Sequence, residues 1–271
     1  MIGSPRDGVG MLGAIAGDII GSVHEGIGTK HVDFPLFVHG SRFTDDTVLT
    51  VAVADCLMTG SPYVDKFHEY TREYPNSGYG LSFMHWVLAG RHEPYNSWGN
   101  GSAMRVSPVA FAFQTLEEVI TEARASAEVT HNHPEGIRGA EATAAATFLA
   151  RHGASKKEIR DITEQRFGYD LSRAIAEIRK TYTFDVSCQG TVPQAITAFL
   201  ESDGYEQAIR LAISLGGDAD TLACIAGGIA AAFYGGVPDH IATRAWALLD
   251  NRLRERVSLF CNTYRIPLSS N

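Results

Sequence analysis

Apolar residues recur at intervals of three or four positions along most of the chain, which is the period of an α-helix with one buried face. Alternating apolar and polar positions, which would indicate strands, occur only weakly, at residues 32–37 and 182–186. The pattern therefore predicts an all-α protein. The segments with helical periodicity are residues 12–25, 47–58, 63–73, 81–89, 103–113, 117–128, 134–151, 156–167, 193–201, 205–214, 221–234 and 239–264.

The predicted helices form one unit rather than two. Alanine-rich stretches at 140–150 and 226–232 predict close helix packing, because small side chains let two backbones approach. No long Pro-, Ser- or Gly-rich linker divides the chain. We therefore expect a single compact orthogonal multi-helix domain over residues 11–271, preceded by a disordered or cloning-derived extension at residues 1–10.

Composition narrows the class of protein. The chain has 271 residues, 45% of them hydrophobic and 20% charged, as expected for a globular protein with a substantial core. A net charge of −8 provides no basic surface for nucleic acid, which is not expected as a stable partner. Asp18 interrupts the apolar N-terminal stretch 11–20, so neither a signal peptide nor a membrane span is expected. The four cysteines are scattered singly, which favours reduced thiols and a cytoplasmic location.

Two clusters of acids and threonines each stand at the predicted start of an apolar helix. They are Thr44-Asp45-Asp46-Thr47 and Gly217-Asp218-Ala219-Asp220-Thr221. Helix capping alone is the simpler explanation for either cluster, since the first turn of a helix favours a carboxylate. A second adjacent carboxylate adds repulsion, however, and two such clusters together point to cations that neutralise them. Oxygen ligands without His or Cys favour Mg²⁺, Mn²⁺ or Ca²⁺, and two clusters suggest two ions.

A second pair of acids lies in the first predicted helix. Asp18 and Glu25 are seven residues apart, close to two helical turns, so we expect both on one face. Gly17 and Gly21 on that face leave room for another group to approach. A solvated polar stripe is the alternative, but the rest of this helix is apolar. Glu25 stands at the helix exit and is placed for a mobile catalytic role.

The stretch 98–105, Trp-Gly-Asn-Gly-Ser-Ala-Met-Arg, opens a further predicted helix. Backbone N–H groups at such a position suit a phosphate or pyrophosphate, although Gly-Asn-Gly is also an ordinary turn. The Walker and Rossmann spacings are both missing. His131 and His133 precede Pro134, and the start of a helix is the alternative to a ligand role for this pair. No Gly-x-Ser-x-Gly motif indicates a serine hydrolase.

In this order and combination, the motifs resemble those of the ADP-ribosylglycohydrolases, which include the dinitrogenase reductase-activating glycohydrolase. The resemblance covers residues 12–234. It implies an all-α domain with a central dimetal cleft that holds two Mg²⁺ or Mn²⁺ ions. It also implies a hydrolase that cleaves the N- or O-glycosidic bond between ADP-ribose and a protein side chain or small acceptor. The matching motifs are Gly17-Asp18-x-x-Gly21-x-x-x-Glu25, Thr44-Asp45-Asp46-Thr47, Gly99-Asn100-Gly101-Ser102-Ala103-Met104-Arg105, Thr130-His131 and Gly217-Asp218-Ala219-Asp220-Thr221.

Carried onto this sequence, the resemblance implies a role for each motif. Glu25 would be the catalytic acid/base. The implied metal ligands are Thr44, Asp45, Asp46, Asp218, Asp220 and Thr221. The implied substrate contacts are Asn100, Gly101, Ser102, Met104, His131 and Gly216. Arginine-directed members use further acids to hold the guanidinium, and Glu93 is the one candidate here, so the linkage stays open.

Two other functions fit parts of the pattern. A non-catalytic ADP-ribose-binding or structural module, such as a crystallin, would have no need of a complete metal set together with Glu25. An all-α prenyl synthase also uses acidic helices and Mg²⁺, but it requires Asp-Asp-x-x-Asp. Here Asp45-Asp46 is followed by Thr47-Val48-Leu49, so the third acid is missing.

Overall fold

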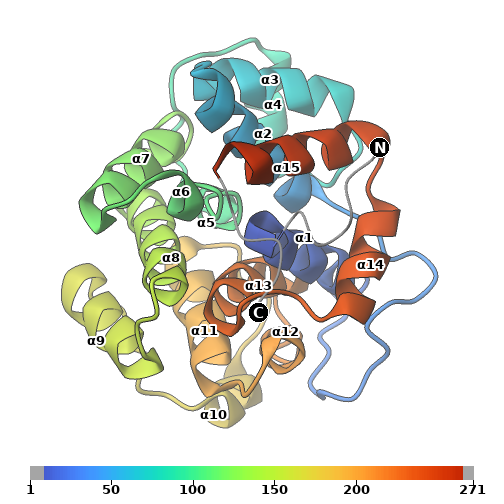
Figure 1. Ribbon diagram of the computed structural model, residues 1–271, viewed down its shortest axis with the longest axis vertical. Coiled ribbons are helices and arrows are strands. Elements are labelled where there is room, and N and C mark those ends of the chain that lie inside the picture. Colours follow the sequence, from blue (N-terminus) through green and yellow to red (C-terminus); the bar gives the residue numbers. More distant parts are fainter. Residues whose placement is uncertain (1–8, 265–271) are drawn as a thin grey trace.

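The computed structural model describes residues 9–264, which are helical apart from their connections (Figure 1). The all-α prediction is confirmed. The helices are α1 (Val9–Gly21), α2 (Asp45–Thr59), α3 (Tyr63–Glu73), α4 (Leu81–Leu88), α5 (Gly101–Met104), α6 (Val109–Ala112), α7 (Leu116–Glu128), α8 (Pro134–Arg151), α9 (Lys156–Phe167), α10 (Ile175–Thr181), α11 (Cys188–Glu201), α12 (Tyr205–Ile213), α13 (Ala219–Tyr234), α14 (Asp239–Leu248) and α15 (Asn251–Thr263).

Several predicted boundaries are wrong. Within residues 9–264 neither strand candidate forms a strand, and one isolated bridge joins Gly99 to Ser187. Segment 103–113 divides into α5 and α6, because Pro108 lacks the N–H that a continuous helix needs. Segment 239–264 divides into α14 and α15, where the Asp250 carboxylate caps the second helix by accepting from the Leu253 N–H at 2.9 Å. The seven-residue α10 is too short for periodicity to predict.

The chain ends lie partly outside the described range. Of the predicted N-terminal extension, residues 1–8 are outside it, whereas Val9 and Gly10 belong to α1. Residues 265–271 are also outside the described range. Among the described helices, none is long and apolar enough to cross a membrane.

Helices α1 and α13 pack along each other at the centre of the molecule (Figure 1). Gly13, Gly17 and Gly21 recur every fourth residue on the contact side of α1. A Cβ on Gly17 would lie 2.1 Å from the Ala223 carbonyl oxygen, and one on Gly21 would lie 2.4 Å from the Cα of Asp220. The space that these glycines leave is thus occupied by the backbone of α13. This contact brings the last turn of α1 to the acidic first turn of α13.

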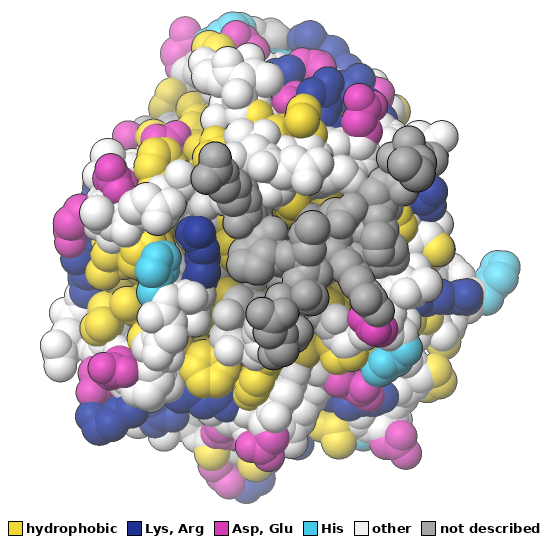
Figure 2. All heavy atoms as spheres, viewed as in Figure 1, with side chains coloured by type: hydrophobic (Ala, Val, Ile, Leu, Met, Phe, Trp, Pro, Cys, Tyr) yellow, Lys and Arg dark blue, Asp and Glu magenta, His cyan; other side chains and the backbone are white. Residues whose placement is uncertain are grey.

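The other helices surround this central pair. Helices α8, α11 and α12 pack against α13, and α2 packs against α1, α3 and α15. All four cysteines are buried, and none of them forms a disulfide bond. On the face seen in Figure 2, Lys and Arg side chains alternate with Asp and Glu over most of the visible rim.

Candidate active site

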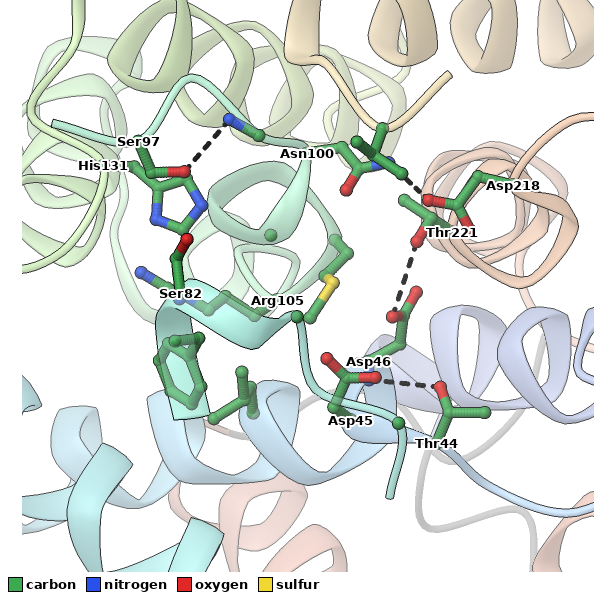
Figure 3. A pocket seen from close by; sticks show the side chains of 18 of the residues that line it. Thr44, Asp45, Asp46, Ser82, Ser97, Asn100, Arg105, His131, Asp218 and Thr221 are labelled. Atoms are coloured by element: carbon green, nitrogen blue, oxygen red, sulfur yellow. Dashed lines mark hydrogen bonds between the residues drawn. The ribbon is translucent and has the colours of Figure 1, made fainter. Parts of the chain in front are cut away.

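A pocket of about 580 Å³ opens where the starts of α2, α5 and α13 converge (Figure 3). This volume is typical of small-molecule sites, which occupy about 300–1,000 Å³. The pocket has two different ends. Five carboxylates line the acidic end, and those of Asp45, Asp46 and Asp218 are labelled in Figure 3. Opposite them, Ser97, Arg105 and His131 lie at what we call the loop end.

The two acidic clusters meet in this pocket. The Thr221 hydroxyl donates to Asp46 Oδ1 at 3.5 Å, which joins the first turns of α13 and α2. Thr44 caps α2, because its Oγ1 accepts from the Asp46 N–H at 3.3 Å. Asp218 occupies the equivalent position before α13, but its side chain makes no capping bond. Capping alone therefore accounts for the first cluster only in part and does not account for Asp218.

Asp18 fastens α1 to the start of α2. Its fully buried carboxylate accepts from the Thr44 N–H at 3.0 Å, the Thr44 hydroxyl at 2.7 Å and the Thr47 N–H at 3.1 Å, and also from the Thr47 hydroxyl. Burial raises the pKa of Asp18 from 3.8 to about 6, against the lowering effect of these hydrogen bonds. Asp18 is thus a support beneath the first acidic cluster.

Glu25 reaches the pocket by a different route from the one predicted. Helix α1 ends at Gly21, so Glu25 lies in the following turn and does not share a helix face with Asp18. Its carboxylate nevertheless joins the acidic end, where single oxygens of Glu25, Asp218 and Asp220 lie within 4.8 Å of one another. Burial and, next, the charge of Asp218 raise the pKa of Glu25, while Arg42 at the same pocket lowers it.

The acidic end fits hard divalent cations. Burial raises the pKa values of Asp45, Asp46 and Asp220 well above their usual range, and neighbouring carboxylates raise them further. Asp46 Oδ2 is buried without a hydrogen-bond partner. An unpartnered carboxylate oxygen among other carboxylates is a position for a cation, because burying unneutralised charge is costly. Ligands that are all oxygen favour Mg²⁺, Mn²⁺ or Ca²⁺.

The Gly-Asn-Gly loop forms a wall between the two ends. The Asn100 side-chain amide donates to Asp218 Oδ2 at 2.7 Å and to Thr191 Oγ1 at 3.1 Å, so this side chain positions the acidic end. A Cβ on Gly101 would lie 3.1 Å from His131 Nε2, so glycine at this position leaves room for the imidazole. Met104 also lines the pocket.

Two of the predicted substrate contacts lie outside the pocket lining. Ser102 is fully buried, and its hydroxyl donates to the Gly136 carbonyl oxygen at 2.7 Å, so the predicted phosphate donor is already engaged in the core. Gly216 has a φ of +68°, and a Cβ there would lie 2.8 Å from the Thr29 carbonyl oxygen. Its role is to let the 26–30 loop approach the turn before α13.

Two further residues considered in the sequence also lie outside the lining. His133 caps α8, since its Nδ1 accepts from the Glu135 N–H at 3.1 Å, so the helix-start explanation is correct. Glu93 is also absent from the lining, and its described contact is a backbone one, with Trp86 Nε1 donating to its carbonyl oxygen at 2.9 Å.

The sequence interpretation missed several lining residues. Trp98 belongs to the stretch 98–105 but was given no role, and Ser97 directly precedes that stretch, so proximity to the Gly-Asn-Gly loop was a usable signal for both. Arg42, Phe83 and Tyr95 reach the pocket from other segments, and no local motif distinguishes them.

Comparison with known proteins agrees with this geometry. The family model of the ADP-ribosylglycohydrolases matches residues 9–260. The chain belongs to this family. The ADP-ribosylglycohydrolase is 28% identical to ADP-ribosylhydrolase ARH3 of Mus musculus, over 83% of this chain and 82% of the relative. It is 27% identical to ADP-ribosylarginine hydrolase Tri1 of Pseudomonas putida, over 88% of this chain and 73% of that one.

A solved structure shares the fold of this ADP-ribosylglycohydrolase. It is described as an ADP-ribosylglycohydrolase-related protein complex and superimposes with a TM-score of 0.73 at 27% identity, over 97% of each chain. The protein is therefore an enzyme of the glycohydrolase type. Its acidic end is the part of the pocket that can hold metal.

Proposed function

We propose that the protein is a dimetal-dependent hydrolase that cleaves the bond between ADP-ribose and a modified side chain or small acceptor. The observation that carries this proposal is the buried, unpartnered Asp46 Oδ2 within a group of carboxylates at the acidic end of the pocket. The proposed ligands of two Mg²⁺ or Mn²⁺ ions are Thr44, Asp45, Asp46, Asp218, Asp220 and Thr221. When bound, two such ions would supply Lewis-acid chemistry, which would orient ribose hydroxyls and stabilise developing negative charge.

The protein's own groups supply the remaining chemistry. Glu25, whose pKa is raised, donates its carboxyl proton to the leaving oxygen or nitrogen as the bond to the anomeric carbon breaks. The resulting carboxylate then accepts a proton from the water that attacks this carbon, which restores the acid. The surrounding carboxylates favour the positive charge that develops on the ribose ring as the bond breaks. Nearby, Asp18 holds Thr44 in place, so the first cluster keeps its geometry during the reaction.

The loop end suits the rest of the substrate. In the Gly-Asn-Gly loop the Gly99 N–H donates to Ser97 Oγ at 3.1 Å and the Asn100 N–H donates to the Val186 carbonyl oxygen at 2.8 Å. The Gly101 N–H is therefore the group of this loop that we propose as the donor to a phosphate oxygen. His131 contacts the distal ribose in this arrangement. Tyr95 and Trp98 offer aromatic surface for the base, and the Trp98 side chain is exposed at the rim.

The charges at the acidic end favour an oxygen-linked acceptor. Among the described residues that line the pocket, the acids are the five carboxylates of the acidic end. None of them stands apart from that group to hold a guanidinium. Arg42, beside Glu25, adds a positive charge where the acceptor would leave. A cationic arginine acceptor is repelled by this side chain, whereas a serine oxygen or an ester is not.

The test is a panel of ADP-ribosylated arginine, serine, nucleic-acid and O-acetyl substrates, with release of ADP-ribose measured in Mg²⁺ or Mn²⁺. We expect the wild-type protein to turn over at least one conjugate and the Asp45→Ala and Asp218→Ala variants to lose that activity while remaining helical by circular dichroism. Normal turnover by these variants in a chelator would rule the proposal out. Tight ADP-ribose binding without turnover of any conjugate would favour the binding-module alternative. A cytoplasmic location remains a prediction.

A further inference from the structure

Arg105 is a buried cation behind the loop end of the pocket. Its side chain is fully buried, and its guanidinium carbon lies 4.2 Å from the ring centroid of Phe67. Nη2 donates to the Ser126 carbonyl oxygen at 3.0 Å and to Thr130 Oγ1 at 2.9 Å. No described carboxylate forms an ion pair with it, and its Nε and Nη1 are buried without partners. A buried charge of this kind is costly, which suggests that its position serves the pocket.

The Thr130 hydroxyl connects Arg105 to His131. This hydroxyl is fully buried, accepts the Arg105 hydrogen bond and lies 2.7 Å from His131 Nδ1. Arg105 has no acceptor, so the hydroxyl must use a lone pair toward it and keeps one proton to donate. Among the residues that the structure describes, His131 Nδ1 is the acceptor within reach of that proton. If Nδ1 carried a hydrogen instead, the hydroxyl proton would be buried without an acceptor, which is unfavourable.

The opposite edge of the imidazole faces the ligand space. His131 lines the pocket, and its Nε2 lies beside the Gly-Asn-Gly loop, 3.1 Å from the position of a Cβ on Gly101 and 3.6 Å from one on Gly99. Within the described part of the chain, Nε2 has no hydrogen-bond partner. A hydrogen on Nε2 would therefore point to a bound molecule.

We infer that Arg105 and Thr130 are positioning residues that hold His131 as the neutral Nε2–H tautomer, so that it donates to an oxygen of the ligand at the loop end. This inference rests on the proposed function for the identity of that ligand, ADP-ribose. Burial and the Arg105 charge both lower the pKa of His131 well below its usual range, which agrees with a neutral ring. His131 then recognises a lone pair, on a ribose hydroxyl or a phosphate, and takes no part in proton transfer.

The direct test is the nitrogen spectrum of the wild-type protein, because ¹⁵N shifts distinguish the two neutral histidine tautomers. The protein would carry ¹⁵N-labelled histidine, and His131→Asn would identify the His131 signal among the ten histidines. We expect Nε2 to carry the proton near neutral pH. A proton on Nδ1, or a ring that is charged at that pH, would overturn the inference without any variant of Thr130.

A pair of Thr130 variants tests the relay itself. Thr130→Val keeps the shape of the side chain and removes the hydroxyl, and Thr130→Ser restores it. We expect Thr130→Val to give mixed tautomers and to weaken ADP-ribose binding by calorimetry about tenfold, as expected for one hydrogen bond. Thr130→Ser should remain close to the wild type in both measurements. Unchanged tautomer and affinity in Thr130→Val would show a merely structural contact and overturn the inference.

The two proposals can fail separately. If wild-type protein does not bind ADP-ribose, the proposed function fails, and the tautomer spectrum still decides whether the relay exists. If ADP-ribose binds and is released from conjugates but His131 carries its proton on Nδ1, the relay is wrong and the hydrolase proposal stands.

Discussion

The Asn100 side-chain amide donates to Asp218 Oδ2 at 2.7 Å and so joins the Gly-Asn-Gly loop to the acidic end of the pocket. The same amide also reaches Thr191 Oγ1 on α11, at 3.1 Å. Asp218 is the acid whose side chain does not cap its helix, and Asn100 orients it instead. This amide therefore links the loop directly to an acid of the acidic end.

Removing this amide should weaken metal binding. Groups that orient a metal ligand typically change affinity about 10–100-fold when they are lost, and we expect Asn100→Ala to lower Mn²⁺ affinity by that factor. Calorimetric titration with Mn²⁺ measures it. Asn251→Ala, on the exposed start of α15, is the matched control and should bind as the wild type does. Equal affinities in the two variants would show that Asn100 does not orient Asp218.

Metal removal should make stability depend on pH in a defined direction. Asp18 has a pKa of about 6 in the folded protein and 3.8 as the ordinary value, and the pKa values of the acids around it are raised as well. Between about pH 4 and pH 6, and above, the folded state therefore binds more protons than the unfolded state. Because of this, the free energy of unfolding of the metal-free protein falls as the pH rises through that range. Cations that neutralise the carboxylates remove this loss of stability at higher pH.

The measurement is Tm in chelator and in saturating Mn²⁺, at about pH 5 and about pH 8. We expect the difference in Tm between the two conditions to widen at the higher pH. A metal-free protein that becomes more stable over this range, with no widening of the difference, would contradict the assignment of the acidic end as a cation site.

Helix contact along α1 should be sensitive to a single methyl group. A Cβ on Gly17 would lie 2.1 Å from the Ala223 carbonyl oxygen, so Gly17→Ala must separate α1 from α13. Overpacking of this kind costs about 1–3 kcal/mol of unfolding free energy, or more where backbone must move. Urea unfolding measures it. Gly204→Ala is the control, because no atom lies within 4 Å of its Cβ position and its φ of −177° is extended. Equal stability of the two variants would refute the close contact.

Replacing Glu25 should separate catalysis from binding. Glu25→Gln keeps the side-chain shape and removes the proton-transfer group, so we expect kcat to fall about 10²–10⁴-fold with little change in ADP-ribose affinity. Glu93→Gln is the control outside the described lining and should retain wild-type kcat on every substrate, including an arginine conjugate. Wild-type kcat in Glu25→Gln would exclude this residue as the acid/base.

Arg42 should influence the choice of acceptor. Arg42→Glu replaces the positive charge beside Glu25 with a negative one, which would attract a guanidinium. We expect the ratio of kcat/KM for arginine-linked over serine-linked ADP-ribose to rise on the order of tenfold. Arg244→Glu, exposed on α14 and outside the lining, serves as the charge control. An unchanged ratio would remove Arg42 as a determinant of linkage.

The predicted helix starts and strands differ in how far they depend on neighbouring residues alone. The Thr44 cap and the start of α13 depend on residues within one turn, so the sequence predicts them. The strand expected at 32–37 fails because its alternation comes from loop residues such as Phe34, which packs against His24 with ring centroids 4.6 Å apart and ring planes tilted by 55°. The helix expected to reach Glu25 ends at Gly21, where the Ser22 hydroxyl donates back to the Ile19 carbonyl oxygen at 2.9 Å.

The sequence by itself determined the all-α class, the acid-and-threonine clusters and the Gly-Asn-Gly loop, because periodicity and residue type are local properties. The tertiary structure decided which of these groups meet. The Thr221 contact with Asp46 depends on the glycine-mediated approach of α1 and α13, and the Arg105–Thr130 contact depends on α7 lying behind the loop. Such contacts join residues far apart in the chain, and their formation depends on how whole helices pack rather than on any local pattern.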